Sequence, residues 1–397
     1  MRSPRYWAGA AIKINEKNAQ EMLTLKSERV NIVGEVNLDD NNMTMFANQL
    51  FLEYFVENTD LVMKCLKANK VILRTLDPGI LSKTICRAEE VEMSMNMLTI
   101  SQLNSMLIEI TNCKDLKLTK LNLDFNNIED AVPETLSSAV SRLTEVSLGC
   151  TLPTNGQLNI LLGDISKSKK LNLRMLDLGS SDLSDIPTDM LTKAIGRLEK
   201  FDASDAHLTT TQLNALFRYL SQASDVKLQT LNLSMNDLSD ISPKFLPTAV
   251  CKLEKVDLSD TELTTNHLNF LFSEISECTI LTLKKLDVSE NFLSELNEDT
   301  LASAVCRLEE VHLNLTHITT SQLNTIFEKI SKWSQSKLKI ITLKNNNLSD
   351  VHKDDLENAV SKLEKAGLLE DDLTYEQILI FCDAPDLYNK IQNCNFW

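Results

Sequence analysis

Histidines and carboxylates are the side chains in this sequence that could hold a metal or move a proton. The five histidines are scattered, and only His312 and His317 are close together. The apolar alternation around His312 puts it on a strand, whereas His317 follows the next turn. Metal ligands must converge on one point, so this spacing predicts no metal site. The histidines are His207, His267, His312, His317 and His352.

Motifs for catalysis are absent from the sequence. It contains no glycine-rich phosphate loop, no His-Glu-x-x-His, no Gly-x-Ser-x-Gly and no Cys-x-x-Cys. The 56 acidic residues in 397 place many carboxylates near one another by composition alone, which gives no support to acid/base catalysis. We therefore predict that the protein is not an enzyme and needs no cofactor.

The elements that carry these residues recur every 55 residues. In one series the motif opens at Leu118, Leu173, Leu228, Leu283 and Leu338, and a second series, half a period out of phase, opens at Ala88, Leu143, Leu198, Leu253, Leu308 and Leu363. Apolar residues two apart, as in Leu228-x-x-Leu231-x-Leu233, have the period of a strand, and the period then changes to that of a helix. Each unit is predicted to be a strand, a turn and a helix, stacked into a solenoid of parallel strands.

Several columns of the repeat predict specific contacts. Asparagines in one column, with Ser181 replacing them once, fit buried amides that bond turn backbone groups between repeats. Threonines that stand three residues before a glutamine predict capping boxes at helix starts. Prolines in a third column suit the first helical turn. The columns are Asn126, Asn236, Asn291, Asn346; Thr99, Thr154, Thr209, Thr319, Thr374; and Pro78, Pro133, Pro243.

These motifs resemble the leucine-rich repeat family, in particular the subclass of two alternating long repeats found in ribonuclease inhibitor and in the recognition region of NOD-like receptors. The resemblance rests on Leu118-x-x-Leu121-x-Leu123-x-x-Asn126 and its four successors and covers roughly residues 33–380. It implies an α/β solenoid shaped like a horseshoe, with a parallel sheet on the concave face and helices on the convex face. Where the family often has cysteine in the second series, this chain has Asn96, Thr151, Ala206, Thr261 and Thr316.

The predicted domain organisation is one solenoid over residues 33–373 with a cap at each end. Residues 1–32 form a weakly repeat-like cap with a degenerate first strand at Ala10–Ile14, and residues 374–397 form a helical cap and tail. Caps are needed because terminal repeats would otherwise expose apolar faces. The sequence leaves open the oligomeric state, the order of the N-terminal residues and whether the chain is part of a larger receptor.

Cysteine usage and hydropathy predict a cytoplasmic location. The nine cysteines recur in repeat columns, as at Cys86, Cys251 and Cys306, which favours small buried residues over a disulfide framework. No apolar stretch approaches the roughly 18–20 residues of a membrane span, and the apolar run Trp7–Ile12 is too short for a secretory signal. We predict a reduced protein that does not bind membranes.

Side chains that alternate with the buried leucines are expected on the concave face. One row carries aspartates and the neighbouring row carries lysines. The N-terminal part is acidic, with few lysines beside Glu35, Asp39, Glu90, Glu92, Asp124 and Glu145. Apolar residues that interrupt the polar pattern are candidate anchors for a partner; for Phe125, Met235 and Leu315, partial burial under a turn is the alternative. The predicted partner-binding residues are Asp177, Asp202, Asp257, Asp287, Lys200, Lys255, Lys285, Glu310, His312, Phe125, Met175 and Ile340.

The formal net charge of −16 favours a protein partner with a basic surface, bound through this acidic face. Nucleic acid is disfavoured because an acidic surface repels phosphates. The competing interpretation is that Leu-Asp-Leu-Ser is the ordinary usage of this family and that the lysine and aspartate rows neutralise each other. Alternative functions are an enzyme regulator, either a ribonuclease-inhibitor-like inhibitor or a GTPase-activating solenoid, or the ligand-sensing fragment of an immune-type receptor.

Overall fold

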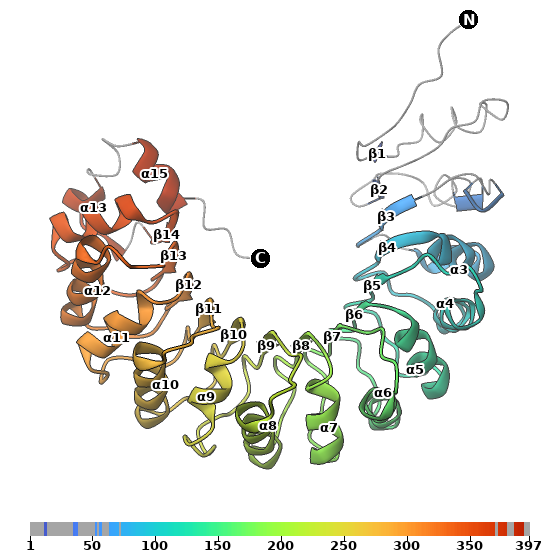
Figure 1. Ribbon diagram of the computed structural model, residues 1–397. Helices are drawn as coiled ribbons and strands as arrows, with labels where there is room; N and C mark the ends of the chain where they lie inside the picture. The colour runs from blue at the N-terminus through green and yellow to red at the C-terminus, as the bar shows by residue number, and fades with distance from the viewer. Residues whose placement is uncertain are drawn as a thin grey trace, which may run out of the picture. The chain divides into compact units, whose positions relative to one another are not determined.

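The computed structural model describes residues 12–13, 35–38, 52–53, 55–57, 63–70, 73–369, 372–378 and 385–392. The chain forms two compact units, Met1–Phe201 and Asp202–Trp397, which we call the first and second unit. Both are built on the same plan (Figure 1). The predicted cap at residues 1–32 lies outside the described residues except for Ile12 and Lys13.

Each unit contains parallel strands whose order in the sheet is the chain order. The first unit contains β1 (Ile12–Lys13), β2 (Glu35–Asn37), β3 (Met63–Lys67), β4 (Ala88–Glu92), β5 (Lys120–Asn122), β6 (Glu145–Ser147) and β7 (Met175–Asp177). The chain position that divides the units falls within β8 (Lys200–Asp202). The second unit contains β9 (Thr230–Asn232), β10 (Lys255–Asp257), β11 (Lys285–Asp287), β12 (Glu310–His312), β13 (Ile340–Thr342) and β14 (Lys365–Gly367).

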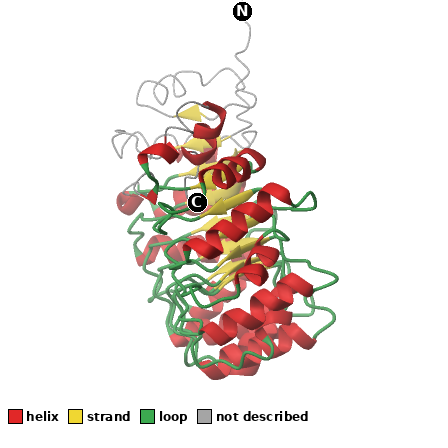
Figure 2. Cartoon of the chain, turned by 90° about the vertical axis from the view of Figure 1, so that its left-hand side faces the viewer, coloured by secondary structure: helices red, strands yellow, loops and turns green. Residues whose placement is uncertain are grey.

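A helix or helical turn follows most strands and covers one side of the sheet in each unit (Figures 1 and 2). In the first unit these are a 3₁₀ turn (Leu73–Thr75), α3 (Pro78–Arg87), α4 (Ile100–Asn112), α5 (Pro133–Arg142), α6 (Asn155–Lys167) and α7 (Thr188–Ile195). In the second unit they are α8 (Thr210–Gln222), α9 (Leu246–Cys251), α10 (Thr265–Glu277), α11 (Glu298–Val305), α12 (Thr320–Lys332), α13 (Lys353–Lys362) and α15 (Pro385–Gln392).

The core lies between the strands and the helices, as the apolar period predicts. In β9, Leu231 is buried while Thr230 and Asn232 are half-exposed, which is the alternation expected of a strand with one buried face. The helix side contributes Phe217, Phe272 and Phe327, all fully buried. These three phenylalanines stand 55 residues apart, and burial of such aromatic side chains is a large hydrophobic contribution to the core.

The capping boxes are confirmed and also connect neighbouring repeats. At the start of α12, Thr319 Oγ1 accepts from the backbone N–H of Gln322, and the Gln322 amide donates to the carbonyls of Leu293 and Leu296 in the preceding repeat, both at 2.8 Å. In α10 the threonine–glutamine pattern does not apply, because histidine replaces glutamine. His267 Nε2 lies 2.7 Å from the Ile241 carbonyl, so this buried ring takes the place of a glutamine side chain.

The expectation for the proline column holds twice and fails once. Pro78 and Pro133 stand in the first turn of α3 and α5, whereas Pro243 lies in a turn before α9, which begins at Leu246. A helix beginning at Pro243 would need an N–H from Pro247, and proline has none. The helix therefore starts later, with Pro247 in its first turn.

A column of basic residues, not anticipated from the motifs, closes the C-terminal ends of the longer helices. Arg142 donates to the carbonyls of Ile110 and Thr111, each at 2.6 Å. Arg307 donates in the same way to the Ser276 carbonyl at 2.6 Å. Cations suit helix C-termini, where carbonyls lack partners. The column recurs every 55 residues at Arg87, Arg142, Arg197, Lys252, Arg307 and Lys362.

At the C-terminal end, α15 packs against α13 and β14. Lys390 on α15 donates to the Ser361 carbonyl at 2.7 Å, so the helix meets the end of α13. The cysteines of the described residues are free thiols, and Cys86, Cys251 and Cys306 are buried. Burial raises the pKa of the Cys86 and Cys251 thiols to about 12. Within the described part of the chain, no helix is long and apolar enough to cross a membrane.

Candidate protein-binding surface

The predicted partner-binding residues flank the buried centre of each strand. Met175 and Asp177 lie on β7 on either side of buried Leu176, and Lys200 begins β8. In the second unit, registered pairs join Lys255 to Lys285 and Asp257 to Asp287, followed by Glu310, His312 and Ile340 on the next two strands. Phe125 lies in the turn after β5.

The second unit has a cleft on its strand face, with a volume of about 460 Å³. Its carboxylates are Asp257, Asp287 and Glu290, and Leu315 and Lys344 contribute to its wall. Serine hydroxyls and amides supply the remaining polar lining. We call this site the acidic cleft, because three carboxylates and one lysine leave a formal charge of −2.

Each aspartate of this row closes the turn that follows its strand. Asp257 Oδ1 accepts from the backbone N–H of Ser259 at 2.9 Å and from its hydroxyl at 2.7 Å. In the same position of β9, Asn232 Oδ1 accepts from the N–H of Ser234 at 2.9 Å. An amide oxygen closes the turn as well as a carboxylate does. The turn therefore requires an oxygen acceptor at this position, but it does not require a negative charge.

Asp257 is a carboxylate of the acidic cleft whose pKa is raised. Burial raises the pKa of its carboxyl, the negative charges of Asp287 and Asp202 raise it further, and the bonds from Ser259 only partly oppose this. No lysine of the described residues lies within ion-pair distance of Asp202, Asp257 or Asp287. Direct lysine contacts therefore do not neutralise these three aspartates.

Three other predicted contact residues engage one another. Glu310 accepts from Lys285 at 3.0 Å and lies 2.8 Å from His312 Nε2. Burial opposes ionisation of Glu310, but these two hydrogen bonds outweigh it and hold the pKa of Glu310 below its ordinary value. His312 is almost fully buried and its Nδ1 lies 3.0 Å from Thr342 Oγ1. A partner would therefore compete with these internal contacts.

The strand face of the first unit corrects one expectation. Lys67 lies 3.4 Å from Glu35 and 4.0 Å from Glu92. Lys120 lies 3.1 Å from Glu90 and 3.6 Å from Glu145. These glutamates thus have lysines beside them, because the pairing register brings together residues about 30 apart in sequence.

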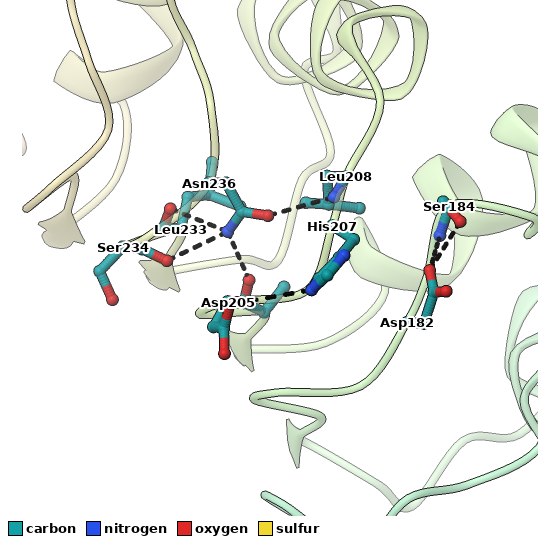
Figure 3. Close-up of polar contacts among 9 residues, drawn as sticks. Asp182, Ser184, Asp205, His207, Leu208, Leu233, Ser234 and Asn236 are labelled. Atoms are coloured by element: carbon teal, nitrogen blue, oxygen red, sulfur yellow. Dashed lines mark hydrogen bonds and ion pairs between the residues drawn. The ribbon is translucent and has the colours of Figure 1, made fainter.

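An asparagine ladder holds the turns that follow the strands. Asn236 Nδ2 donates to the carbonyls of Ala203 at 2.8 Å and Leu233 at 3.0 Å, and its Oδ1 accepts from the N–H of Leu208 (Figure 3). Asn126 makes the equivalent bonds to Met93 and Leu123. These contacts confirm the buried-amide prediction. In the first unit Ser181 breaks the ladder, and its buried hydroxyl has no partner among the described residues.

Beside the ladder runs a row of residues with left-handed backbone, which we call the turn row. Met95 and Phe125 both have φ of 57°, and their side chains are 47% and 57% exposed. Some turns have a second left-handed residue two positions later: Met97 follows Met95, and Leu152 follows Cys150 in the turn after β6. Their side chains are 73% and 62% exposed. Met235 and Leu315 in the second unit are 57% and 41% exposed, so these side chains, like Phe125, are partly covered and still leave apolar surface open to a partner. Of these first-unit residues, only Phe125 was predicted from the sequence to contact a partner. Met95, Met97 and Leu152 also occupy repeat positions that recur every 55 residues, so this spacing could have identified them as turn residues.

The described residues contain no group of three or more histidine, cysteine, aspartate or glutamate side chains placed to hold a metal ion. What this surface can do chemically is bind: it offers carboxylates, hydroxyls and exposed apolar side chains on a rigid frame.

Comparisons with known proteins agree with this geometry. The leucine-rich repeat family model matches residues 117–139 and 227–248. The human NACHT, LRR and PYD domains-containing protein 13 is 31% identical over 153 residues, which is 35% of this chain and 14% of that protein. The chain therefore spans a small part of the length of this curated relative.

A solved structure supports the fold. A chain of the yeast Rad7–Elc1 complex covers 83% of this chain and 79% of its own length, with a TM-score of 0.52 and 10% identity. The leucine-rich repeat-containing protein LegL7 of Legionella pneumophila covers 83% and 98%, with a TM-score of 0.46 and 13% identity. The chain has the leucine-rich repeat fold, with parallel strands on one side of each unit and helices on the other.

Proposed function

We propose that this protein is a non-enzymatic interaction scaffold that binds a basic protein partner through the acidic cleft of the second unit. The fold supports the general role, because leucine-rich repeat solenoids present long, rigid surfaces for other proteins. The chemistry of the cleft supports the more specific proposal, that the partner has a basic surface. A lysine or arginine side chain of the partner would stand between Asp257 and Asp287, with Glu290 beside them.

The observation that carries this proposal is the gathering of Asp257, Asp287 and Glu290 in one cleft, where burial and the neighbouring negative charges raise the pKa of Asp257. A partly buried carboxylate that is destabilised by like charges, with no cation of the described residues paired to it, is stabilised when a cation arrives. The charge is also unnecessary for the local fold, since Asn232 closes the same turn without it. A charge that the fold does not require, placed in a cleft, favours a binding role.

The experiment compares three forms of the full chain, each immobilised and exposed to a lysate of the source organism. The cleft variant is Asp257→Asn/Asp287→Asn, which keeps both turn-closing oxygens. The matched control is Asp225→Asn/Glu277→Gln, which removes the same charge from exposed residues outside the cleft. Thermal unfolding verifies that all three forms are folded.

We expect wild type and control to retain the same partner and the cleft variant to lose it. Salt should release the partner from wild type, because the contact is between charges. Equal retention by all three forms would contradict the proposal and leave the aspartates as turn-closing residues only.

A second candidate is that the chain corresponds to the repeat part of a larger multidomain protein. The observation that favours it is the 31% identity to human NACHT, LRR and PYD domains-containing protein 13. In that case ligand sensing rather than scaffolding would be the role of the cleft. Full-length transcript sequencing tests this: a continuous reading frame that joins these repeats to a nucleotide-binding module supports it, and its absence from all transcripts contradicts it.

A further inference from the structure

The turn row of the first unit carries apolar side chains that nothing in the described residues covers. Met95, Met97, Phe125 and Leu152 are all about half exposed or more. They lie in consecutive turns, because the N–H of Met95 donates to the Asp124 carbonyl and that of Phe125 to the Gly149 carbonyl, each at 2.9 Å. Consecutive parallel strands are about 4.8 Å apart, so these side chains form one patch, which we call the apolar turn patch.

The second unit shows that this backbone does not require apolar residues. At the positions equivalent to Met95 and Phe125 it holds Asp205, Asp260 and Glu290, with φ of 49°, 50° and 59°. The inter-repeat bond is also kept, since the N–H of Glu290 donates to the Asn314 carbonyl at 2.9 Å. Left-handed backbone is easiest for glycine, asparagine and aspartate, so neither conformation nor stability accounts for phenylalanine and methionine here.

A cluster of exposed apolar side chains on a folded domain marks a protein contact. Aromatic and methionine side chains are the types enriched in such contacts, and methionine adapts its shape to a partner. By contrast, the apolar turn-row residues of the second unit, Met235 and Leu315, are separated by polar ones at Asp260 and Glu290.

The charges next to the patch indicate what partner fits. On the adjoining strands, Lys67 and Lys120 each lie between two glutamates. Four glutamates and two lysines leave a formal charge of −2 on this strand face, and in the turns Asp124 is offset by Lys70, the turn-row residue of the preceding repeat. A second copy of this chain, at −16, would be repelled, whereas a segment with lysine or arginine around its apolar residues would be attracted.

We propose that the apolar turn patch binds a segment of a partner protein whose apolar side chains are flanked by basic residues. The site is distinct from the acidic cleft in both residues and chemistry: apolar contact supplies most of its affinity, and charge selects the partner.

The test uses a fluorescent probe peptide of about 18 residues made of leucine and lysine with helical amphipathic spacing. Its binding to the full chain is measured by fluorescence anisotropy, beside a leucine–glutamate and a serine–lysine peptide of the same pattern. The patch variant is Met95→Asn/Phe125→Asn; Asn345 shows that asparagine suits this position, with φ of 58°.

The matched control is Met235→Asn, which makes the same change at the equivalent position of the second unit and does not touch the residues that line the acidic cleft. Met235 is 57% exposed, as is Phe125 in the patch. We expect the patch variant to weaken binding of the leucine–lysine probe about tenfold or more and the control to change it little. The other two peptides should bind more weakly than the probe.

Three results would overturn the proposal: no binding of the leucine–lysine probe, unchanged binding to the patch variant, or equal binding of the leucine–glutamate peptide. Sedimentation of the chain alone tests the alternative that a second copy of this chain binds the apolar turn patch. A wild-type dimer that the patch variant turns into a monomer would assign the patch to a second copy. Thermal unfolding of both variants verifies that any loss of binding is not a loss of fold.

Discussion

The turns of the two units have the same backbone and different side chains. In both, a left-handed residue follows the strand and donates its N–H to the next repeat, as Phe125 and Met235 do at 2.9 and 3.0 Å. In the first unit two neighbouring turns place Met95 and Phe125 there, and in the second unit Asp205, Asp260 and Glu290 share this position with Met235, Leu315 and Asn345. The comparison teaches that the ladder and the inter-repeat bonds determine the turn, while its side chains are free to serve binding.

The strand faces differ in a second way. In the first unit, glutamates alternate with Lys67 and Lys120 and are paired with them. In the second unit, Asp257 and Asp287 pair with no cation of the described residues, and burial among like charges raises the pKa of Asp257. On the first face each of these glutamates has a lysine beside it, whereas on the second face Asp257 and Asp287 have none among the described residues and favour a cation from outside.

Breaking the asparagine ladder should give the largest effect, and an equal one in both units. Asn126→Ala and Asn236→Ala each leave buried carbonyls and N–H groups without partners, so we expect each to lower the free energy of unfolding by about 3 kcal/mol. Denaturant unfolding measures this. The neighbouring Asn127→Ala is the control, since Asn127 makes one exposed bond to Glu129. A loss below about 1 kcal/mol in either unit would show that water replaces the ladder.

Completing the ladder should give a smaller effect of opposite sign. Ser181→Asn places an amide where a buried hydroxyl now lacks a partner among the described residues, so we expect about 1 kcal/mol of added stability. Ser180→Asn, the same change one residue earlier in the turn row, should be close to neutral. Chemical denaturation of the three forms decides it, and a destabilised Ser181→Asn variant would mean that the amide does not fit this repeat.

The smallest effect should be a pH-dependent difference at the acidic cleft. Because the pKa of Asp257 is raised in the folded state, its ionised form disfavours folding above that pKa, and the penalty disappears as the pH falls. Asp257→Asn should therefore stabilise the protein at neutral pH and give no gain below the ordinary pKa of 3.8.

Thermal unfolding across this pH range measures the difference, with Asp225→Asn as the exposed control. A destabilised Asp257→Asn variant at neutral pH would contradict the electrostatic account. Partner binding should follow the opposite course, weakening as the pH falls and Asp257 is protonated.

Much of the frame was predictable because each repeat uses the same local rules. Alternating apolar residues, threonine–glutamine pairs and the asparagine column act within a few residues or at a fixed spacing, so the roles of Thr319 and Asn236 follow from the sequence pattern alone. The exceptions arise where one residue stands in for another, as His267 does for glutamine, or where Pro247 shifts a helix start.

The sequence by itself determined the repeat, the strand and helix positions, and which residues flank each buried leucine, because these follow from periods of two and about 3.6 residues. Only the tertiary structure decided which charges are paired. Lys120 balances Glu90 and Glu145, and Lys255 balances no aspartate of the described residues, because ion pairing depends on distances of a few ångströms between side chains about one repeat apart. The exposure of Phe125 and the burial of His312 were likewise decided there, since burial depends on the surrounding repeats and not on residue type.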